Sequence, residues 1–352
     1  MRKKTAIKVG NLMLGQGHPV RVQTMLNTDP RDFRKSLAQL RMVVNRGAEI
    51  VRVTVPDQES LKVFARLLEK ATCPLVADIH FNHRLAIGAI EAGAAKIRIN
   101  PGNIGTEREA RDVVKSALEH SVPIRIGVNS GSLPRQILSR FGHPSPEALC
   151  ETVRGFVAMF EDQGFFDIVV SAKTSSAADT IRTNRLLFES IRYPLHIGVT
   201  EAGPLLPGIV KSSLALAELL THGIGDTIRI SLTAPPVDEV DTGFHLLKYL
   251  GLRNEGIELI SCPTCGRTGV NLIRIVNQAY RKLPMFRKTL KLALMGCAVN
   301  GPGEAKEADL GLAFGKGEAL YFEKGKVMRK VSSDKALDFI IDRVERFTGG
   351  RS

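Results

Sequence analysis

The sequence contains no tryptophan, and aromatic residues make up only 5% of it. Proteins that bind single-stranded nucleic acid stack bases on aromatic side chains set among basic ones, and no such stripe occurs here. No apolar run approaches the roughly 20 residues of a membrane-spanning helix. The basic start, residues 1–5, lacks an apolar segment of signal-peptide length. These absences predict a cytoplasmic protein whose partners include neither nucleic acid nor a membrane.

Cysteine is also scarce, with five residues in a chain of 352. An odd number of cysteines argues against a disulfide framework and for a reducing compartment. Cys73 and Cys150 lie far upstream in apolar or mixed surroundings, so we expect both to be ordinary buried thiols.

The other three cysteines form a pattern typical of a metal site. Cys262 and Cys265 make a C-x-x-C pair, and Cys297 lies in a Gly/Pro-rich segment that ends at Glu304. Three thiolates leave one ligand position open, as in an iron–sulfur cluster with one distinct iron that can bind substrate. Structural zinc usually takes four Cys or His ligands, and a thioredoxin-like pair needs no third cysteine. The pattern favours a cluster, with zinc and a redox pair as alternatives.

The formal net charge is +13, which indicates an acidic partner such as a phosphorylated substrate, a redox protein or nucleic acid. Without the aromatic stripe, the phosphorylated substrate is preferred. Hydrophobic residues make up 43% of the sequence and charged residues 24%, enough for a full core. The length allows one large domain and a smaller one.

Eight short β-branched runs alternate with helical segments between residues 20 and 235. This alternation predicts an α/β protein with a (β/α)8 barrel, also called a TIM barrel. A doubly wound open sheet is the alternative, but its glycine-rich phosphate fingerprint is missing after the first strand. The runs are 20–25, 50–55, 75–81, 96–100, 124–129, 168–173, 195–200 and 227–232. A small hairpin before residue 20 is expected to close the barrel floor.

A second, smaller α+β domain is expected after the charged stretch 253–256, which has the character of a linker. The predicted domains are therefore residues 1–252 and 253–352. A helix over 244–250 would end the first. In the second, strands are expected at 257–261, 290–295, 310–314, 319–322 and 326–331, and helices at 271–282 and 334–347.

Polar side chains interrupt the barrel strands near their C-terminal ends, where barrel active sites lie. Spacing of two residues puts Arg98 and Asn100 on one face of their strand. Converging cations repel each other unless an anion joins them, and arginine suits phosphate. We therefore predict a pocket for a polyanion, most simply a diphosphate. The expected substrate-binding residues are Arg52, His80, Arg98, Asn100, Arg125, Asn129, Lys173, His196, Thr200, Arg229 and Ser231.

Asp78 and Glu201 are the acidic exceptions at these strand ends. Each is either a charge partner for the cations or a catalytic residue that donates a proton or orients a substrate hydroxyl. His80 and His196 are equally consistent with a structural and a functional role.

Taken together, these residues make the chain similar to the bacterial 4-hydroxy-3-methylbut-2-enyl diphosphate synthases of the non-mevalonate isoprenoid pathway, in their two-domain form. The resemblance covers essentially the whole chain. It is carried by residues 22–25, 76–81, 97–103, 126–133, 198–203, 261–267 and 295–304.

The resemblance implies one 4Fe–4S cluster per subunit, held by Cys262, Cys265 and Cys297, with Glu304 as an unusual fourth ligand at the reactive iron. It implies a cluster domain similar to half of a sulfite-reductase module. The substrate would be 2-C-methyl-D-erythritol 2,4-cyclodiphosphate, opened and dehydroxylated with two electrons from ferredoxin or flavodoxin. It also implies a head-to-tail homodimer in which each cluster domain caps the partner's barrel. A zinc-bearing nucleic-acid binder and a non-redox barrel enzyme acting on phosphorylated substrates remain the competing classes.

Overall fold

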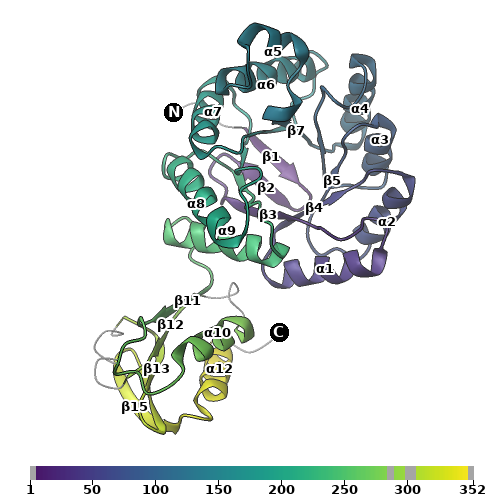
Figure 1. The fold of residues 1–352 in the computed structure, drawn as a ribbon. Helices are drawn as coiled ribbons and strands as arrows, with labels where there is room; N and C mark the ends of the chain where they lie inside the picture. The colour runs from purple at the N-terminus through teal and green to yellow at the C-terminus, as the bar shows by residue number, and fades with distance from the viewer. Residues whose placement is uncertain (1–4, 284–288, 298–306, 348–352) are drawn as a thin grey trace. The chain divides into compact units, whose positions relative to one another are not determined.

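The structure is a computed structural model, and it describes residues 5–283, 289–297 and 307–347. The chain forms two compact units, Met1–Arg253 and Asn254–Ser352 (Figure 1). Arg253, the first residue of the expected linker, is anchored in the first unit. Its guanidinium donates to the Val20 carbonyl at 3.1 Å and to the Glu49 carboxylate at 3.2 Å.

The first unit is built on eight parallel strands in the order β8-β7-β6-β5-β4-β3-β10-β9. A bridge between Val170 of β8 and Leu195, next to β9, closes this sheet into a barrel. The predicted barrel is confirmed, and the open-sheet alternative is wrong. The strands are β3 (Arg21–Met25), β4 (Ile50–Thr54), β5 (Leu75–Asp78), β6 (Lys96–Ile99), β7 (Ile124–Asn129), β8 (Ile168–Lys173), β9 (His196–Ile197) and β10 (Thr227–Ile228).

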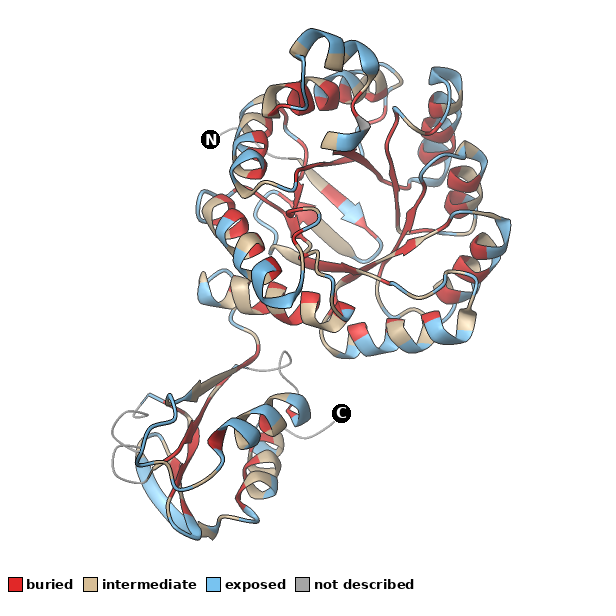
Figure 2. Ribbon diagram, viewed as in Figure 1, coloured by how far each residue is buried: buried red, intermediate tan, exposed pale blue. Residues whose placement is uncertain are grey.

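Helices surround the barrel, and their buried faces turn toward the strands (Figure 2). No helix among the described residues has both the length and the apolar character to cross a membrane. The helix predicted over 244–250 begins earlier, at Pro236, because a proline and two acidic residues in the first turn favour a helix start there. The helices are α1 (Phe33–Asn45), α2 (Gln58–Leu68), α3 (His83–Glu91), α4 (Glu107–His120), α5 (Arg135–Phe141), α6 (Pro146–Glu161), α7 (Ala177–Ser190), α8 (Leu205–Thr221) and α9 (Pro236–Tyr249).

An antiparallel hairpin, β1 (Ala6–Val9) and β2 (Leu12–Gly15), closes one end of the barrel as expected. Its apolar side chains join residues at the beginnings of β4, β5 and β8 in one buried cluster, which consists of Ile7, Val9, Leu14, Ile50, Val76 and Val169. Because these strand residues lie at the N-terminal ends, the hairpin forms the barrel floor and leaves the C-terminal end open for a site.

The second unit is a five-stranded mixed sheet with the order β11-β12-β13-β14-β15. Strands β11 to β13 are parallel, and β13 to β15 are antiparallel. Two amphipathic helices pack on it around a core of leucines and aromatic residues. The elements are β11 (Ile257–Ser261), α10 (Leu272–Lys282), β12 (Leu290–Met295), β13 (Leu310–Phe314), β14 (Glu318–Glu323), β15 (Lys326–Ser332) and α12 (Ala336–Phe347).

Candidate active site

The interior of the barrel is lined by cations. On β6, Lys96 and Arg98 alternate with apolar neighbours, so both project from the same face of the strand. Arg98 is in register with Asp78 of β5 and with Arg125 of β7, which places these three side chains on one side of the sheet. The buried or largely buried cations are Arg52, Lys96, Arg98, Arg125, Lys173 and Arg229.

Asp78 is the charge partner of the cations on β4 and β6. Its carboxylate lies 3.3 Å from Arg98 Nη1, 3.5 Å from Arg52 Nε and 3.4 Å from His80 Nε2. Burial opposes its charge, but Arg52, the hydrogen bond from His80 and Arg98 together lower the pKa of Asp78 well below its usual range. Asp78 is therefore ionised at neutral pH, and it holds two arginines in place.

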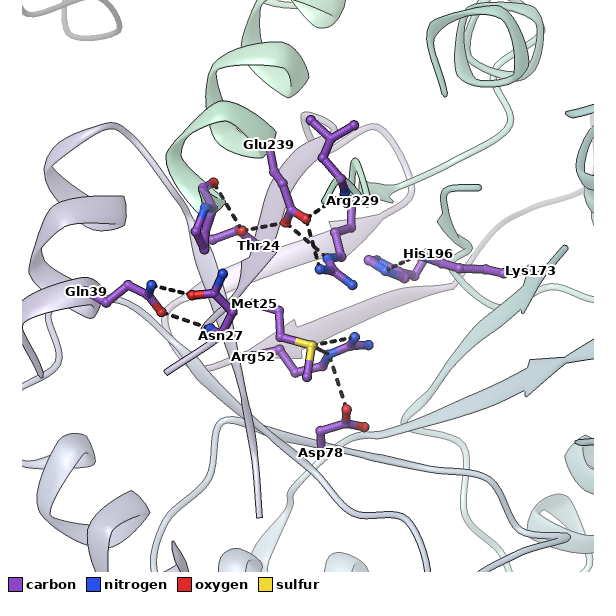
Figure 3. Close-up of polar contacts among 12 residues, drawn as sticks. Thr24, Met25, Asn27, Gln39, Arg52, Asp78, Lys173, His196, Arg229 and Glu239 are labelled. Atoms are coloured by element: carbon purple, nitrogen blue, oxygen red, sulfur yellow. Dashed lines mark hydrogen bonds and ion pairs between the residues drawn. The ribbon is translucent and has the colours of Figure 1, made fainter. Parts of the chain in front are cut away.

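Glu239 is a second buried carboxylate, and it comes from helix α9 rather than from a strand (Figure 3). Its oxygens accept from Arg229 Nη2 at 3.0 Å and Nε at 3.2 Å, from the Thr24 hydroxyl at 2.9 Å and from the Leu232 amide at 3.1 Å. Four donors on a side chain that is 3% exposed fix the direction in which Arg229 points. Glu239 is not among the site residues predicted from the sequence.

Lys173, at the end of β8, is held by side chains of the adjacent β9 and β10 segments. Its Nζ lies 3.1 Å from Nε2 of His196, whose Nδ1 lies 2.8 Å from the Thr227 hydroxyl. Burial and the neighbouring Lys173 lower the pKa of His196 well below its usual range, so the ring is neutral. A neutral ring accepts from Lys173 through Nε2 and donates to Thr227 through Nδ1.

Two glycines make room for the long cationic side chains. A Cβ added at Gly127 would lie 2.5 Å from Nε of Arg98, and one at Gly198 would lie 2.8 Å from Nζ of Lys173. Real carbon contacts are about 3.5–4.0 Å, so any larger residue would displace these cations. Glycine is therefore required for steric reasons at position 127 in the stretch 126–133 and at position 198 in the stretch 198–203.

Several buried donors in the barrel have no hydrogen-bond partner within the described parts of the chain. They include the Lys96 ammonium, Nε and Nη1 of Arg125, Nε of Arg98 and the amide nitrogen of Asn100. Buried polar groups are normally satisfied, and an unpaired buried cation is costly. An anion that enters the barrel would satisfy these donors, so the interior has the chemistry of a polyanion site.

Other predicted residues lie nearer the rim. The His80 side chain is 46% exposed, and Asn129, Thr200 and Ser231 are half-buried. Glu201 is exposed, outside the network of described side-chain contacts, with a φ of 51° in the left-handed region. That backbone conformation is uncommon for a residue other than glycine and often accompanies a functional loop.

A cavity of about 480 Å³ opens beside Arg229 and Glu239. It is also lined by Met25 and Thr54, the last residues of β3 and β4, so it lies at the C-terminal end of the barrel. Its volume lies within the range of small-molecule pockets. Arg229 is the predicted substrate-binding residue in its lining, and the rest of the lining comes mainly from the loops after β3 and β4 and from the start of α9.

The second unit brings two of the cysteine segments together. Cys262 follows β11 and Cys297 follows β12, and these strands are parallel neighbours. The amide of Gly296 donates to Sγ of Cys262 at 3.3 Å. Cys265 is exposed, and hydrogen bonds from the backbone and side chain of Arg267 lower its pKa. The donors beside Cys265 favour its thiolate, which is the form that binds a metal.

The three thiols are not gathered into one ligand set. Within residues 5–283, 289–297 and 307–347, no three Cys, His, Asp or Glu side chains are arranged to hold a metal ion. Glu304, the expected fourth ligand, lies outside the described residues. The donor chemistry fits a cluster, because soft sulfur ligands lie at adjacent strand ends with amide donors beside them.

Comparison with known proteins covers both units. The description "GcpE TIM-barrel domain" matches residues 4–244, and "GcpE protein C-terminal domain" matches residues 258–346. The chain is 48% identical over 347 residues to the 4-hydroxy-3-methylbut-2-en-1-yl diphosphate synthase (flavodoxin) of Caldanaerobacter subterraneus, with 98% of each chain covered. It is 45% identical over 345 residues to the protein of that name from Thermodesulfovibrio yellowstonii, with 98% of this chain and 99% of the other covered.

Solved structures of other barrels share the fold of the first unit. The 3-dehydroquinate dehydratase of Geobacillus kaustophilus matches with a TM-score of 0.51 at 17% identity, covering 71% of this chain and 99% of that one. A dihydropteroate synthase of Xanthomonas albilineans matches with a TM-score of 0.50 at 13% identity, covering 71% of this chain and 98% of that one. At such identities the likeness concerns the barrel alone.

Proposed function

The chain belongs to the GcpE family, and we propose that it converts 2-C-methyl-D-erythritol 2,4-cyclodiphosphate to (E)-4-hydroxy-3-methylbut-2-enyl diphosphate in isoprenoid biosynthesis. It is an oxidoreductase, a 4-hydroxy-3-methylbut-2-en-1-yl diphosphate synthase like the relatives that it matches over nearly its full length. The structural observation that carries the proposal is the cationic barrel interior, whose buried donors lack partners within the described chain.

The barrel binds the diphosphate in this proposal. Arg98, Arg125, Lys173 and Arg229 face its charges, and each charge-assisted hydrogen bond contributes about 1.5–3 kcal/mol. Asp78 orients Arg52 and Arg98 rather than delivering a proton, because its neighbours keep it ionised. The remaining expected residues, Asn100, Asn129, Thr200 and Ser231 with His80 and His196, position the substrate or its cationic ligands.

Glu201 remains the candidate that donates a proton or orients a substrate hydroxyl. It is exposed at a strained backbone position in the loop that follows β9, and its side chain has no partner within the described chain. Replacing it should therefore lower kcat more than substrate affinity.

The second unit would hold one 4Fe–4S cluster through Cys262, Cys265 and Cys297, with Glu304 as the fourth ligand. When bound, such a cluster supplies electrons and a Lewis acid. The donors of Arg267 stabilise negative charge on the sulfur of Cys265, and the amide of Gly296 donates to Sγ of Cys262 and orients it. Flavodoxin appears in the names of the relatives, and we propose it, or ferredoxin, as the electron donor.

We also propose a cytoplasmic homodimer in which each cluster domain caps the partner's barrel. Co-expression of an Arg98→Ala/Arg125→Ala variant with a Cys297→Ser variant tests this arrangement. A mixed dimer then has one site with an intact barrel and an intact cluster, so activity should return in part. Isolated mixed dimers no more active than either parent would show that the site is not shared between subunits.

Anaerobic purification followed by iron, sulfide and zinc analysis tests the function most directly, together with turnover of the cyclodiphosphate under reducing conditions. Brown protein with about four irons per chain and turnover support the proposal. Colourless protein with zinc supports the nucleic-acid-binding alternative. Turnover of another phosphorylated substrate that survives Cys262→Ser supports the non-redox enzyme.

A further inference from the structure

Lys96 is a buried lysine that the proposed function leaves without a role. Its side chain is 0% exposed, and its ammonium group has no hydrogen-bond partner within the described residues. Lysine is almost never fully buried without a partner. A lysine buried in this way inside a barrel either binds a ligand or has a structural role.

The position of Lys96 places it beneath the predicted diphosphate pocket. Lys96 is in register with Val76, which packs on the N-terminal hairpin in the floor cluster. Arg98 follows two residues later on the same face, about 6.6 Å further along the strand. The four-carbon stem of Lys96 thus enters the barrel between the apolar floor and the arginine row, with its charge at the end of a flexible chain.

The surroundings of Lys96 are electropositive. Burial lowers the pKa of Lys96 well below its usual range, and Arg125 and Arg52 lower it further. The neighbouring Arg125 is itself buried, with Nε and Nη1 unpartnered in the described chain. Asp78 and Glu239, the buried carboxylates among these cations, are occupied by arginines. What would satisfy Lys96 and Arg125 together is an anion from outside the chain.

We propose that Lys96 is a further anion-binding residue of this pocket, the deepest one, and that its amino group binds a phosphate oxygen of the ligand held by Arg98 and Arg125. The inference rests on the proposed function, in that it adds one residue to the anion pocket. A ligand-binding role and a packing role for Lys96 have different effects on stability. A Lys96 that binds the ligand destabilises the free barrel and stabilises the complex, whereas a Lys96 kept for packing stabilises both.

Lys96→Met tests the proposal in the full-length protein, because methionine keeps most of the stem and removes the charge. The probe is inorganic pyrophosphate, a simple diphosphate, measured by calorimetry and thermal unfolding at constant ionic strength with chloride as the control salt. Lys115→Met, which removes an exposed lysine of α4, is the matched control. Lys96→Gln is the second variant, should methionine prevent folding.

We expect Lys96→Met to bind pyrophosphate at least about tenfold more weakly, the equivalent of one charge-assisted hydrogen bond. The melting temperature of the free variant should equal or exceed that of the wild type, because a buried amino group that has no hydrogen-bond partner within the described residues has been removed. Lys115→Met should match the wild type in both measurements.

Unchanged pyrophosphate affinity in Lys96→Met overturns the assignment of Lys96, and so does a fall in melting temperature without a fall in affinity. The anion pocket itself is tested separately by the wild type and Arg98→Ala. If the wild type binds no pyrophosphate, or Arg98→Ala binds it equally well, the pocket of the proposed function fails and Lys96 with it. If Arg98→Ala loses pyrophosphate affinity and Lys96→Met does not, the anion pocket is supported and Lys96 is not part of it.

Discussion

Replacing Gly127 by alanine should disable the anion pocket without removing a single charge. The new Cβ would lie 2.5 Å from Nε of Arg98, 3.1 Å from its Nη2 and 3.2 Å from its Cζ. Since carbon contacts settle at about 3.5–4.0 Å, the guanidinium must move by about 1 Å. The backbone of Gly127 does not adopt the left-handed conformation, so the alanine itself is not strained.

Gly127→Ala should lower the affinity for the ligand more than it lowers the stability of the free protein. In the free protein, Arg98 donates to Asp78 and to the Gly127 carbonyl, both at 3.3 Å, and such long bonds together contribute about 1 kcal/mol. A charge-assisted bond to a phosphate contributes about 1.5–3 kcal/mol, so pyrophosphate affinity should fall about 10- to 150-fold. Calorimetric titration and thermal unfolding measure the two quantities on the same sample.

Gly155→Ala is the matched control, because a Cβ there meets nothing within 4 Å and the residue lies inside helix α6. It should leave pyrophosphate affinity unchanged and stabilise the fold by up to about 1 kcal/mol, the helix preference of alanine over glycine. If Gly127→Ala binds pyrophosphate like the wild type while Arg98→Ala does not, the pocket accommodates the added methyl group and the packing argument is refuted.

Three further predictions concern the cluster and the charge balance. Serine at Cys262, Cys265 or Cys297 should abolish stable cluster binding and turnover; full visible absorbance with full iron content in any of them would contradict the ligand assignment. Glu304→Ala should lose more activity than iron, because three thiolates can still hold a cluster, and wild-type activity would exclude Glu304 from the reactive iron. Burial raises the pKa of Asp78, but the cationic neighbours of Asp78 lower it by more. The charge of Asp78 therefore stabilises the fold above the unfolded carboxyl pKa of about 4, and this stabilisation is lost as the pH falls below that value. Asp78→Asn should therefore lower the melting temperature at pH 7 and flatten its fall below about pH 4; identical pH curves would contradict this role.

The barrel was predictable because each strand is a short β-branched run between helical segments, and periodicity of this kind is local. Six of the eight runs differ from the observed strands by at most three residues, but the runs 195–200 and 227–232 each yield a strand of only two residues, His196–Ile197 and Thr227–Ile228. The reason is Gly198, where a Cβ would lie 2.4 Å from the Arg229 carbonyl. That close approach ends the regular ladder, and it depends on a segment 31 positions away.

Two residues of the site, Glu239 and Lys96, were not predicted from the sequence, and the reason lies in contacts that only the folded chain makes. Glu239 lies on a helix, and only the folded chain shows that it reaches Arg229, ten positions upstream. The signal available was a proline and two acidic residues, which predict a helix start rather than a site. Lys96 lies in a run that was singled out, yet it precedes the C-terminal end where activity is expected. Its complete burial depends on the floor hairpin, and this is not visible in sequence spacing.

The floor hairpin has a consequence for the order of events during synthesis. Its apolar cluster includes Val169, and Thr5 just before it donates to the carbonyl of Arg192 at 2.9 Å. The hairpin strands thus leave the ribosome some 160 to 190 residues ahead of these partners. At 5–20 residues per second, the hairpin waits about 10–40 s for them. The hairpin is therefore made early but docks late, and a nascent chain arrested before β8 should expose it to protease.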